Sequence, residues 1–394
     1  MRILQLHNHH ASLGGAMEVL AHEAELLFEG GHAVTQYTLP AAEEMGLGPI
    51  RSGAKAVWNR QAAAEVARRI DDFEPDVVHV HTPFPLMSPS VFRAAYDKGV
   101  PAVTTLHSYR YSCVAGTCWR DGDLCEDCVG KRLKLPGVRH RCYHDSIGAS
   151  GALTLGLVVH RAAGTFNRCV ARYLTLTDFS RRLLIRDGFP SDRIVVKPNS
   201  VPDPGFTPEA RTDERRLVFA ARLIDIKGVQ TLLDAWAKVP PGMKLVIAGD
   251  GPLRSAVEER ARTDPSVEYV GWVSESDVLE LMAGAEAVIV PSEWYEGLPL
   301  VILRSLAVGT PVVVSDLDNF SEDVIADDVG WAFRVRDSGD LAATLATLVA
   351  DPELARSRRA AARQSYESRY SPPADLRRLE AVYRSVTDDP SLRQ

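Results

Sequence analysis

Two basic side chains follow a strand-like run in the second half of the chain. Arg222 and Lys227 lie in the segment FAARLIDIKG, where an apolar run ends before a helical pattern that starts near Gly228. Parallel strands end at one edge of their sheet, and cations placed there beside a helix N-terminus suit a diphosphate. The alternative is that both are ordinary surface charges. The spacing therefore predicts a phosphate site, with solvated surface as the competing interpretation.

A loop in the same half combines carboxylates with the start of a helix. The segment PSEWYEGLP holds Glu296 and is followed by the helical pattern LVILRSLAVG, so the amides of Gly297, Leu298 and Leu300 open that helix. Such amides can hold phosphate oxygens, and a neighbouring carboxylate can hold sugar hydroxyls. Capping of the helix by an acidic residue is the alternative.

Glycines and a histidine mark three other connections. Gly14 and Gly15 in SLGGA precede the first helical pattern and allow close approach of a ligand to the backbone. Gly249, in the turn AGDGP, either also allows a ligand to approach the backbone or belongs to an ordinary loop between a strand and a helix. His107 follows the strand-like run AVTTL, which puts an imidazole at a sheet edge, although a lone histidine is more often structural.

Other histidines lie near strand ends. His7 and His9 follow the first strand-like run, where they could bind hydroxyl groups or a metal, or could simply be polar residues at a sheet edge. In DVVHVHTP, His79 is predicted to lie in the core and His81 to face an acceptor.

Five of the six cysteines fall within residues 113–142. In a cytosolic protein such a cluster more often binds a metal than forms disulfides. The spacing predicts a closed, tetrahedral structural Zn²⁺ site, and free thiols or disulfides are the alternatives. The predicted ligands are Cys113, Cys125, Cys128 and Cys142, and Cys118, His140 or His144 could replace one of them.

Composition narrows the class of protein. The chain has 394 residues, a net charge of -7 and 45% hydrophobic residues, which suits two or perhaps three globular domains and disfavours a nucleic-acid partner. The first apolar run stops at Leu6, too early for a signal peptide, and no run is long enough to cross a bilayer. We therefore expect a cytoplasmic protein, and a peripheral membrane contact stays open.

Strand-like runs alternate with helical patterns along most of the chain, which predicts an α/β fold with parallel sheets covered on both faces. A segment rich in Pro, Asn and Asp at 197–213 reads as a linker. We expect two Rossmann-like domains whose parallel sheets face an interdomain cleft, and single helices over 56–73 and 147–170. The expected domains are 1–198, with a Cys-rich insertion at 111–145, then 199–370, and a terminal helix in 371–394 that packs back on the first domain.

Taken together, the motifs resemble the retaining glycosyltransferases of family 4, which have the GT-B fold. The segments SLGGA, TLH, YLTLTDFSRRLL, VKPNSV, ARLIDIKG, AGDGPL and PSEWYEGLPLVI occur in the family's order. The resemblance implies transfer of a hexose-type sugar from a nucleotide-diphosphate sugar, with UDP as a weak default, to a hydroxyl acceptor in polysaccharide, glycolipid or natural-product synthesis. It also implies retention of configuration by front-face substitution, without a catalytic metal.

The resemblance also implies roles for single residues. Arg222 and Lys227 would neutralise the leaving diphosphate, and Glu296 would be the first acid of the E-x7-E motif, which contacts the donor sugar. His107 would lie near that sugar. Backbone groups would approach the sugar or the phosphates at Gly14, Gly15, Gly249, Gly297, Leu298 and Leu300.

Two positions depart from the family pattern. The second acid of E-x7-E is replaced by Arg304, which cannot accept a hydrogen bond from a ribose hydroxyl, so it would reach a phosphate or turn away. The usual Gly-rich loop after VVVSD reads DNFSE at 318–322. A nucleotide-sugar epimerase of GT-B shape and a non-catalytic protein that binds sugar nucleotides are the alternative functions.

Overall fold

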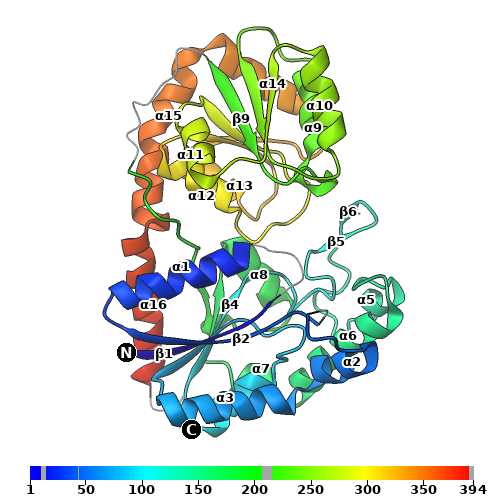
Figure 1. The fold of residues 1–394 in the computed structure, drawn as a ribbon, viewed down its shortest axis with the longest axis vertical. Coiled ribbons are helices and arrows are strands. Elements are labelled where there is room, and N and C mark those ends of the chain that lie inside the picture. The colour runs from blue at the N-terminus through cyan, green and yellow to red at the C-terminus, as the bar shows by residue number, and fades with distance from the viewer. Residues whose placement is uncertain (10–14, 43, 206–214, 390–394) are drawn as a thin grey trace. The chain divides into compact units, whose positions relative to one another are not determined.

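The computed structural model describes residues 1–9, 15–42, 44–205 and 215–389. It divides into two compact units. Unit 1 comprises Met1–Asn199 together with Asp375–Gln394, and unit 2 comprises Ser200–Ala374. Each unit is built on a six-stranded sheet whose paired strands are all parallel (Figure 1). Gly14 and residues 206–214 of the predicted linker lie outside the described residues.

The sheet of unit 1 has the order β2-β1-β3-β4-β7-β8. Its strands are β1 (Arg2–Asn8), β2 (Ala33–Leu39), β3 (Val77–Thr82), β4 (Ala102–Leu106), β7 (Arg172–Thr175) and β8 (Ile194–Val196). Its helices are α1 (Gly15–Glu29), α2 (Pro49–Val57), α3 (Arg60–Phe73), α4 (Ser90–Asp97), α5 (Leu135–Arg139), α6 (Ile147–Ala162), α7 (Thr165–Arg168), α8 (Asp178–Arg186) and α16 (Pro372–Thr387).

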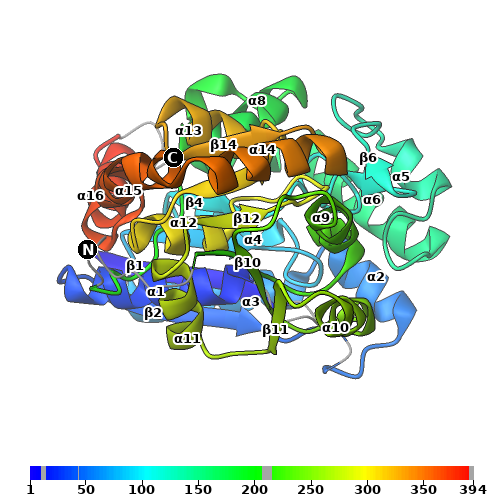
Figure 2. The ribbon, with the colours of Figure 1, turned by 90° about the horizontal axis from the view of Figure 1, so that it is seen from above.

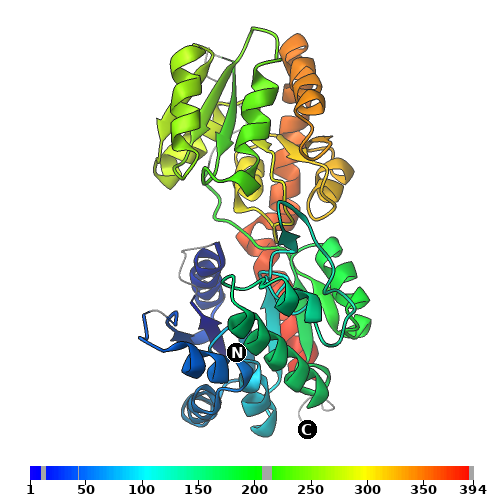
Figure 3. The same ribbon diagram turned by 90° about the vertical axis from the view of Figure 1, so that its right-hand side faces the viewer.

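Both faces of this sheet are covered by helices. One face packs against α1 and α16 around Leu27, Leu379 and Tyr383. Figures 1 and 3 show α16, in red, alongside these strands. The other face packs against α3, α4, α6, α7 and α8 in a second core cluster. The central strands are buried on both sides, which is why they read as continuous apolar runs in the sequence.

Unit 2 repeats the scheme with the order β11-β10-β9-β12-β13-β14. Its strands are β9 (Arg216–Ala220), β10 (Lys244–Ala248), β11 (Val267–Gly271), β12 (Ala287–Val290), β13 (Val312–Ser315) and β14 (Gly330–Phe333). Its helices are α9 (Val229–Trp236), α10 (Arg254–Thr263), α11 (Glu275–Ala283), α12 (Leu300–Ala307), α13 (Ser321–Ala326), α14 (Ser338–Ala350) and α15 (Pro352–Ser365). Figure 2 shows α9, α10 and α14 on one side of the strands and α11, α12 and α13 on the other.

Two predicted helices are interrupted. The helix expected over 56–73 is split into α2 and α3 at Trp58 and Asn59, because the Asn59 side chain caps the amide of Ala62 at 3.0 Å and starts a new helix. The helix expected over 147–170 ends at Ala162, and Gly164, with φ of 72°, separates it from α7.

The Cys-rich segment forms a small irregular unit on unit 1. It contains the two-stranded hairpin of β5 (Trp119–Arg120) and β6 (Asp123–Leu124), which is turned by Asp121 and Gly122, both with positive φ. Its later part is anchored by the buried Asp187, which pairs with Lys134 and, at 2.8 Å, with Arg161. Among the residues described, no helix is both long and apolar enough to cross a membrane.

We predict that Gly228→Ala destabilises unit 2 by about 2–4 kcal/mol. Gly228 has φ of 70°, and a Cβ atom there would lie 1.9 Å from the carbonyl oxygen of Pro291. Gly151→Ala in α6 is the matched control, because its Cβ would have no atom within 4 Å and alanine is the better helix former. Urea unfolding should show a loss for Gly228→Ala and a small gain for Gly151→Ala. Equal midpoints would contradict the prediction.

Candidate functional site

The sheet of unit 2 reverses its strand order between β9 and β12. In open parallel sheets, ligands bind outside the carboxyl ends of the strands at such a reversal. Arg222 and Lys227 follow β9, Gly249 follows β10, and Glu296 follows β12. The predicted phosphate and sugar residues of this unit therefore come from the loops around the reversal point.

Two loops pack together and bring Lys227 to Glu296. The amide of Glu293 donates to the carbonyl of Ile226 at 2.9 Å, which fastens the loop after β12 to the loop after β9. Lys227 Nζ then lies 2.6 Å from Glu296 Oε2, and the Ser292 hydroxyl donates to Oε1. Both charged side chains are largely buried, so each compensates the other. A bound phosphate would meet a cation whose position is already fixed.

Glu296 is also held through its backbone. The Asn319 amide donates to the Glu296 carbonyl at 2.6 Å, and Asn319 is fully buried. Asn319 lies in the DNFSE segment that departs from the family's Gly-rich loop. This side chain therefore supports the loop that carries Glu296, a role that no sequence pattern had indicated.

A pocket of about 260 Å³ lies beside these loops within unit 2. Arg222, Gly249, Trp272 and Arg304 are among the residues that line it. Gly249 has φ of 137°, and a Cβ atom there would lie 1.9 Å from the carbonyl oxygen of Ala221. The glycine is thus required by the close contact of two loops, and it also borders the pocket.

Arg304 is engaged by an acidic neighbour. Its Nε lies 2.9 Å and its Nη2 2.7 Å from Glu275 Oε1, at the first residue of α11. This contact orients the Arg304 guanidinium toward Glu275. Arg304 nevertheless remains one of the residues that line the pocket. The Glu275 side chain is 59% exposed, so one carboxylate stays accessible near the position where the family has its second acid.

The start of α12 has the form expected from the sequence. The helix begins at Leu300, and Pro299 is its N-cap residue. Gly297, Leu298 and Leu300 therefore lie at the N-terminus, where the first amides of a helix have no partners within that helix. Gly15 similarly opens α1 in unit 1, where it is exposed.

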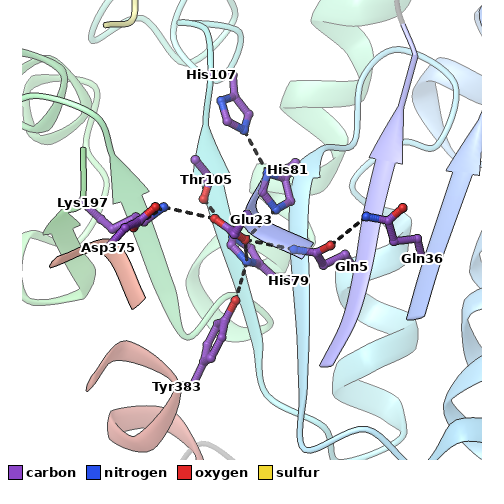
Figure 4. A network of polar contacts seen from close by, with 10 residues as sticks. All are labelled: Gln5, Glu23, Gln36, His79, His81, Thr105, His107, Lys197, Asp375 and Tyr383. Atoms are coloured by element: carbon purple, nitrogen blue, oxygen red, sulfur yellow. Dashed lines mark hydrogen bonds and ion pairs between the residues drawn. The ribbon is translucent and has the colours of Figure 1, made fainter. Parts of the chain in front are cut away.

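His107 is partly buried and lies at the end of a chain of buried polar side chains in unit 1 (Figure 4). Its Nε2 lies 3.0 Å from Nδ1 of His81, whose Nε2 lies 3.1 Å from Glu23 Oε1. The two imidazole rings stack with centroids 5.3 Å apart. A carboxylate–histidine–histidine chain fixes the orientation of the last ring. His81 thus supports His107, whereas the sequence had suggested that His81 faces an acceptor.

Glu23 is the centre of this network. The carboxylate is buried in α1 and lies 3.0 Å from His79 Nδ1 and 3.1 Å from Lys197 Nζ. Lys197 in turn lies 2.9 Å from Asp375 of α16. Gln5 Nε2 donates to Glu23 Oε1 at 3.0 Å. His79 is in the core, as predicted, and also contacts Thr105 and Tyr383 at 2.8 Å each.

The trio of Glu23, His79 and His81 has the ligand types of a metal site. Their ligand atoms all lie within 4.8 Å of one another. Lys197, however, places its ammonium group on the same carboxylate, and a second cation there would be repelled. The trio therefore serves as a hydrogen-bonded ion network.

Burial and charge shift the pKa values in this network. Burial alone would raise the pKa of Glu23, but Lys197, His79 and His81 together hold it well below its usual range. Burial lowers the pKa of His79 to about 4, and burial with His81 nearby keeps the pKa of His107 well below the usual value. At neutral pH, His107 is an uncharged imidazole.

The predicted zinc ligands lie close enough for Cys113, Cys125 and Cys128 to act electrostatically on Cys142. Within the described part of the chain, which includes all six cysteines, no three cysteine sulfurs lie within 4.8 Å of one another, and no disulfide forms. The Cys118 thiol instead bonds to Cys113, which lowers the pKa of Cys113 to about 5. The turn after Cys128 is held by the Lys134–Asp187 ion pair. Zinc binding therefore stays a prediction, and the contacts that the structure shows in this segment are packing and this ion pair.

Two family models match the chain along nearly its whole length. Residues 206–365 match the model "Glycosyl transferases group 1", and residues 11–200 match "Glycosyl transferase 4-like domain". The chain belongs to the group 1, family 4-type glycosyltransferases. This confirms the family resemblance that the motifs carried.

Among curated relatives, glycogen synthase of Mycobacterium tuberculosis is 35% identical over 167 residues, which are 40% of this chain and 39% of that protein. The GDP-mannose-dependent alpha-(1-6)-phosphatidylinositol dimannoside mannosyltransferase of the same species is 32% identical over 233 residues, 54% of this chain and 59% of that protein. The matched segments thus span about two-fifths and three-fifths of these relatives.

A crystal structure of Anabaena HepE in complex with UDP has the same fold. The TM-score is 0.68 at 18% identity, and the match covers 97% of this chain and 99% of that one. With two parallel six-stranded units, the glycosyltransferase chain therefore has the GT-B fold that the sequence predicted.

Acid should destabilise the protein between pH 6.5 and 4. Burial lowers the pKa of both His79 and His160 from 6.5 to about 4, so the unfolded chain binds more protons than the folded one in this window. Stability should therefore fall as the pH drops, by up to about 1.4 kcal/mol per pH unit for each group. Urea unfolding at a series of pH values measures the slope.

His160→Gln provides the comparison for that measurement. His160 is buried and bonds to the Val57 carbonyl at 3.0 Å, a contact that a glutamine amide can replace. The variant should lose stability less steeply below pH 6.5 and should match the wild type in pH dependence above pH 7. An unchanged slope below pH 6.5 would rule out His160 as a contributor.

Proposed function

We propose that this protein is a retaining glycosyltransferase that moves a hexose-type sugar from a nucleotide-diphosphate sugar to a hydroxyl acceptor. The observation that carries the proposal is the Lys227–Glu296 ion pair at the strand-order reversal of unit 2, on loops that follow β9 and β12. Arg222 lies on the same loop as Lys227. Membership of the glycosyltransferase family supports the reaction class. The acceptor would belong to polysaccharide, glycolipid or natural-product synthesis.

The cations would stabilise the leaving group. As the bond to the anomeric carbon breaks, negative charge grows on the diphosphate, and cations fixed nearby stabilise that charge most in the transition state. Lys227 is fixed by Glu296, and Arg222 is exposed on the same loop, where it can close on a phosphate. The amides of Gly297, Leu298 and Leu300 would add hydrogen bonds. Catalysis by these groups requires no divalent metal.

We assign a carboxylate and an uncharged imidazole to the sugar. Glu296 and a neutral His107 are the groups we assign to its hydroxyls, and Gly15 would approach the donor phosphates. His107 is oriented by His81 and Glu23, so the imidazole can offer a fixed hydrogen bond without carrying charge. An uncharged imidazole would not repel the positive charge that develops on a transferred sugar.

The donor base is the open part of the proposal. HepE is known in complex with UDP, and the mannosyltransferase relative depends on GDP-mannose. Trp272 and Arg304 line the 260 Å³ pocket of unit 2, which we assign to the nucleoside. The exposed Glu275 carboxylate, held by Arg304, could accept hydrogen bonds from ribose. UDP remains our first choice.

A panel of nucleoside diphosphates tests the donor site. A ligand that binds only the folded state adds about 2.7 kcal/mol of stability at a concentration of 100 times its Kd. One diphosphate, with UDP expected, should therefore raise the melting temperature by several degrees, while the matching nucleoside without phosphates should not. If no member of the panel shifts the melting temperature, the transferase proposal fails.

Lys227→Ala should weaken binding of the selected diphosphate by about 10- to 100-fold, because a charge-assisted hydrogen bond is lost. Isothermal titration calorimetry measures the affinity, and the melting temperature without ligand shows whether loss of the Glu296 partner unfolds the unit. Lys238→Ala is the control, since Lys238 is an exposed lysine of the same unit that bonds only to Ser338 at 2.8 Å among the contacts described. Equal affinities for wild type and Lys227→Ala would remove Lys227 from the site.

A further inference from the structure

A large cavity lies between α2 and α6 in unit 1, with a volume of about 1030 Å³. Its wall is mostly aliphatic and includes Leu47, Ile50, Val57, Leu153 and Leu155. Among the residues described, no Asp, Glu, Lys or Arg lines it. A wall without charges gives no counter-ion to a charged ligand and favours apolar surface.

The packing of the two helices explains why the space is open. At one end they touch closely, because a Cβ atom on Gly156 would lie 2.7 Å from the Ala56 carbonyl and Trp58 stacks on His160 at 4.5 Å. Gly53 of α2 also lies close to Ala152 of α6, because a Cβ atom on Gly53 would be 3.4 Å from the Ala152 Cβ atom. The space is open beside these contacts. Gly151 in α6 lines the cavity, and a Cβ atom there would have no neighbour within 4 Å.

Exposed apolar side chains surround this part of the surface. Ile50 on α2 is 87% exposed, and Ile147 and Leu155 on α6 are 57% and 51% exposed. Leu133 and Leu135, at the start of α5, are also more than half exposed. Figures 1 and 2 show α2, α5 and α6 grouped together on unit 1. Apolar surface of this kind around an apolar cavity marks a binding site.

His9 is one of the few polar residues in the wall. Ser52, Tyr143, His144 and Ser146 are the other polar side chains in it among the residues described. The His9 ring lies 5.6 Å from that of His7, and His7 acts electrostatically on His107. His9 follows β1 and His107 follows β4, so both lie at the same edge of the parallel sheet.

We infer that this cavity binds the aliphatic chain of the sugar acceptor, so that the acceptor is of the glycolipid class. The inference rests on the proposed function and narrows its acceptor. The aliphatic chain of the acceptor would lie between α2 and α6. Its polar head group would lie at His9, with the reactive hydroxyl on the side of His107. Burial of methylene groups would supply most of the affinity, and His9 would fix the head group.

The lining favours an aliphatic chain over other occupants. Tyr143 is the aromatic residue in the wall, and its ring is already covered by Arg110 at 4.8 Å and by His144 at 4.2 Å, so it offers little stacking surface to an aromatic ligand. A peptide would bring backbone polar groups that this wall cannot satisfy. Methyl and methylene groups of a lipid chain match the surface in both size and polarity.

Alkyl β-D-glucosides of increasing chain length test the inference. Methyl, butyl, hexyl and octyl glucoside are titrated into the full chain below their micelle-forming concentrations, with calorimetric detection. Each methylene that becomes buried should tighten binding about fourfold until the cavity is full. A Kd that does not depend on chain length would overturn the inference.

Three variants locate the binding. Gly151→Leu should fill the cavity and weaken octyl glucoside at least tenfold, with an unchanged circular dichroism spectrum. Ala162→Leu, on the exposed end of the same helix, should bind as the wild type does. His9→Ala should weaken every member of the series by about fivefold and leave the dependence on chain length intact, because only one hydrogen bond is lost. Equal octyl affinity for Gly151→Leu and wild type would place the lipid elsewhere.

Two companion measurements separate the possible failures. If UDP or another diphosphate binds and the glucoside series is flat, the acceptor inference fails and the transferase proposal stands. If the affinity of the glucosides rises with chain length and no diphosphate binds, the transferase proposal fails. The bound aliphatic chain can then no longer be assigned to a sugar acceptor. Sedimentation of the wild type and Gly151→Leu tests whether a second copy of the protein fills the cavity. A dimer that is lost in the variant, together with a Kd of the glucosides that does not depend on chain length, would show this.

Discussion

Glu23 is an ionised carboxylate without access to solvent, and most of unit 1 is arranged around the need to neutralise it. An unpaired buried charge costs several kcal/mol, so its partners cannot leave while the unit stays folded. Those partners come from β1, β3 and the residue after β8, and Lys197 extends the network to Asp375 on α16. The same carboxylate holds His81 and, through it, His107. A charge at the core of the fold thereby determines the orientation of a candidate catalytic ring.

The fold was largely predictable because its strands are buried on both faces. Runs such as DVVHV and KLVIA carry apolar residues at nearly every position, and both lie in central parallel strands. Interruptions were harder to predict, since the break between α2 and α3 depends on the Asn59 cap rather than on apolar spacing. In α1, residue type alone does not identify the buried face: Phe28 is 73% exposed, and the buried residues include Glu23. A charged residue at a core position of a helix was the signal that could have identified the network.

Part of the candidate site was also predictable from sequence, and part was not. Arg222, Lys227, Gly249 and Glu296 follow strand ends in sequence, so strand order alone brings them to one region of unit 2. Partners distant in sequence could not be predicted. Glu275 reaches Arg304 across 29 positions, and Asn319 reaches Glu296 from a segment that seemed only a departure from the family. The cysteines show the same limit: sequence spacing indicates ligand types, and the backbone path decides how closely the sulfurs approach one another.

The place of α16 has a consequence for how the chain folds as it is made. Lys197 and Glu23 emerge from the ribosome long before Asp375, with the whole of unit 2 synthesised in between. At about 5–20 residues per second, this interval lasts roughly ten to forty seconds. Unit 2 is contiguous and can fold during that time, whereas unit 1 still lacks Asp375 and the apolar residues of α16 that cover part of its sheet face. The earlier half of the nascent chain therefore keeps apolar surface exposed until the later half has been made.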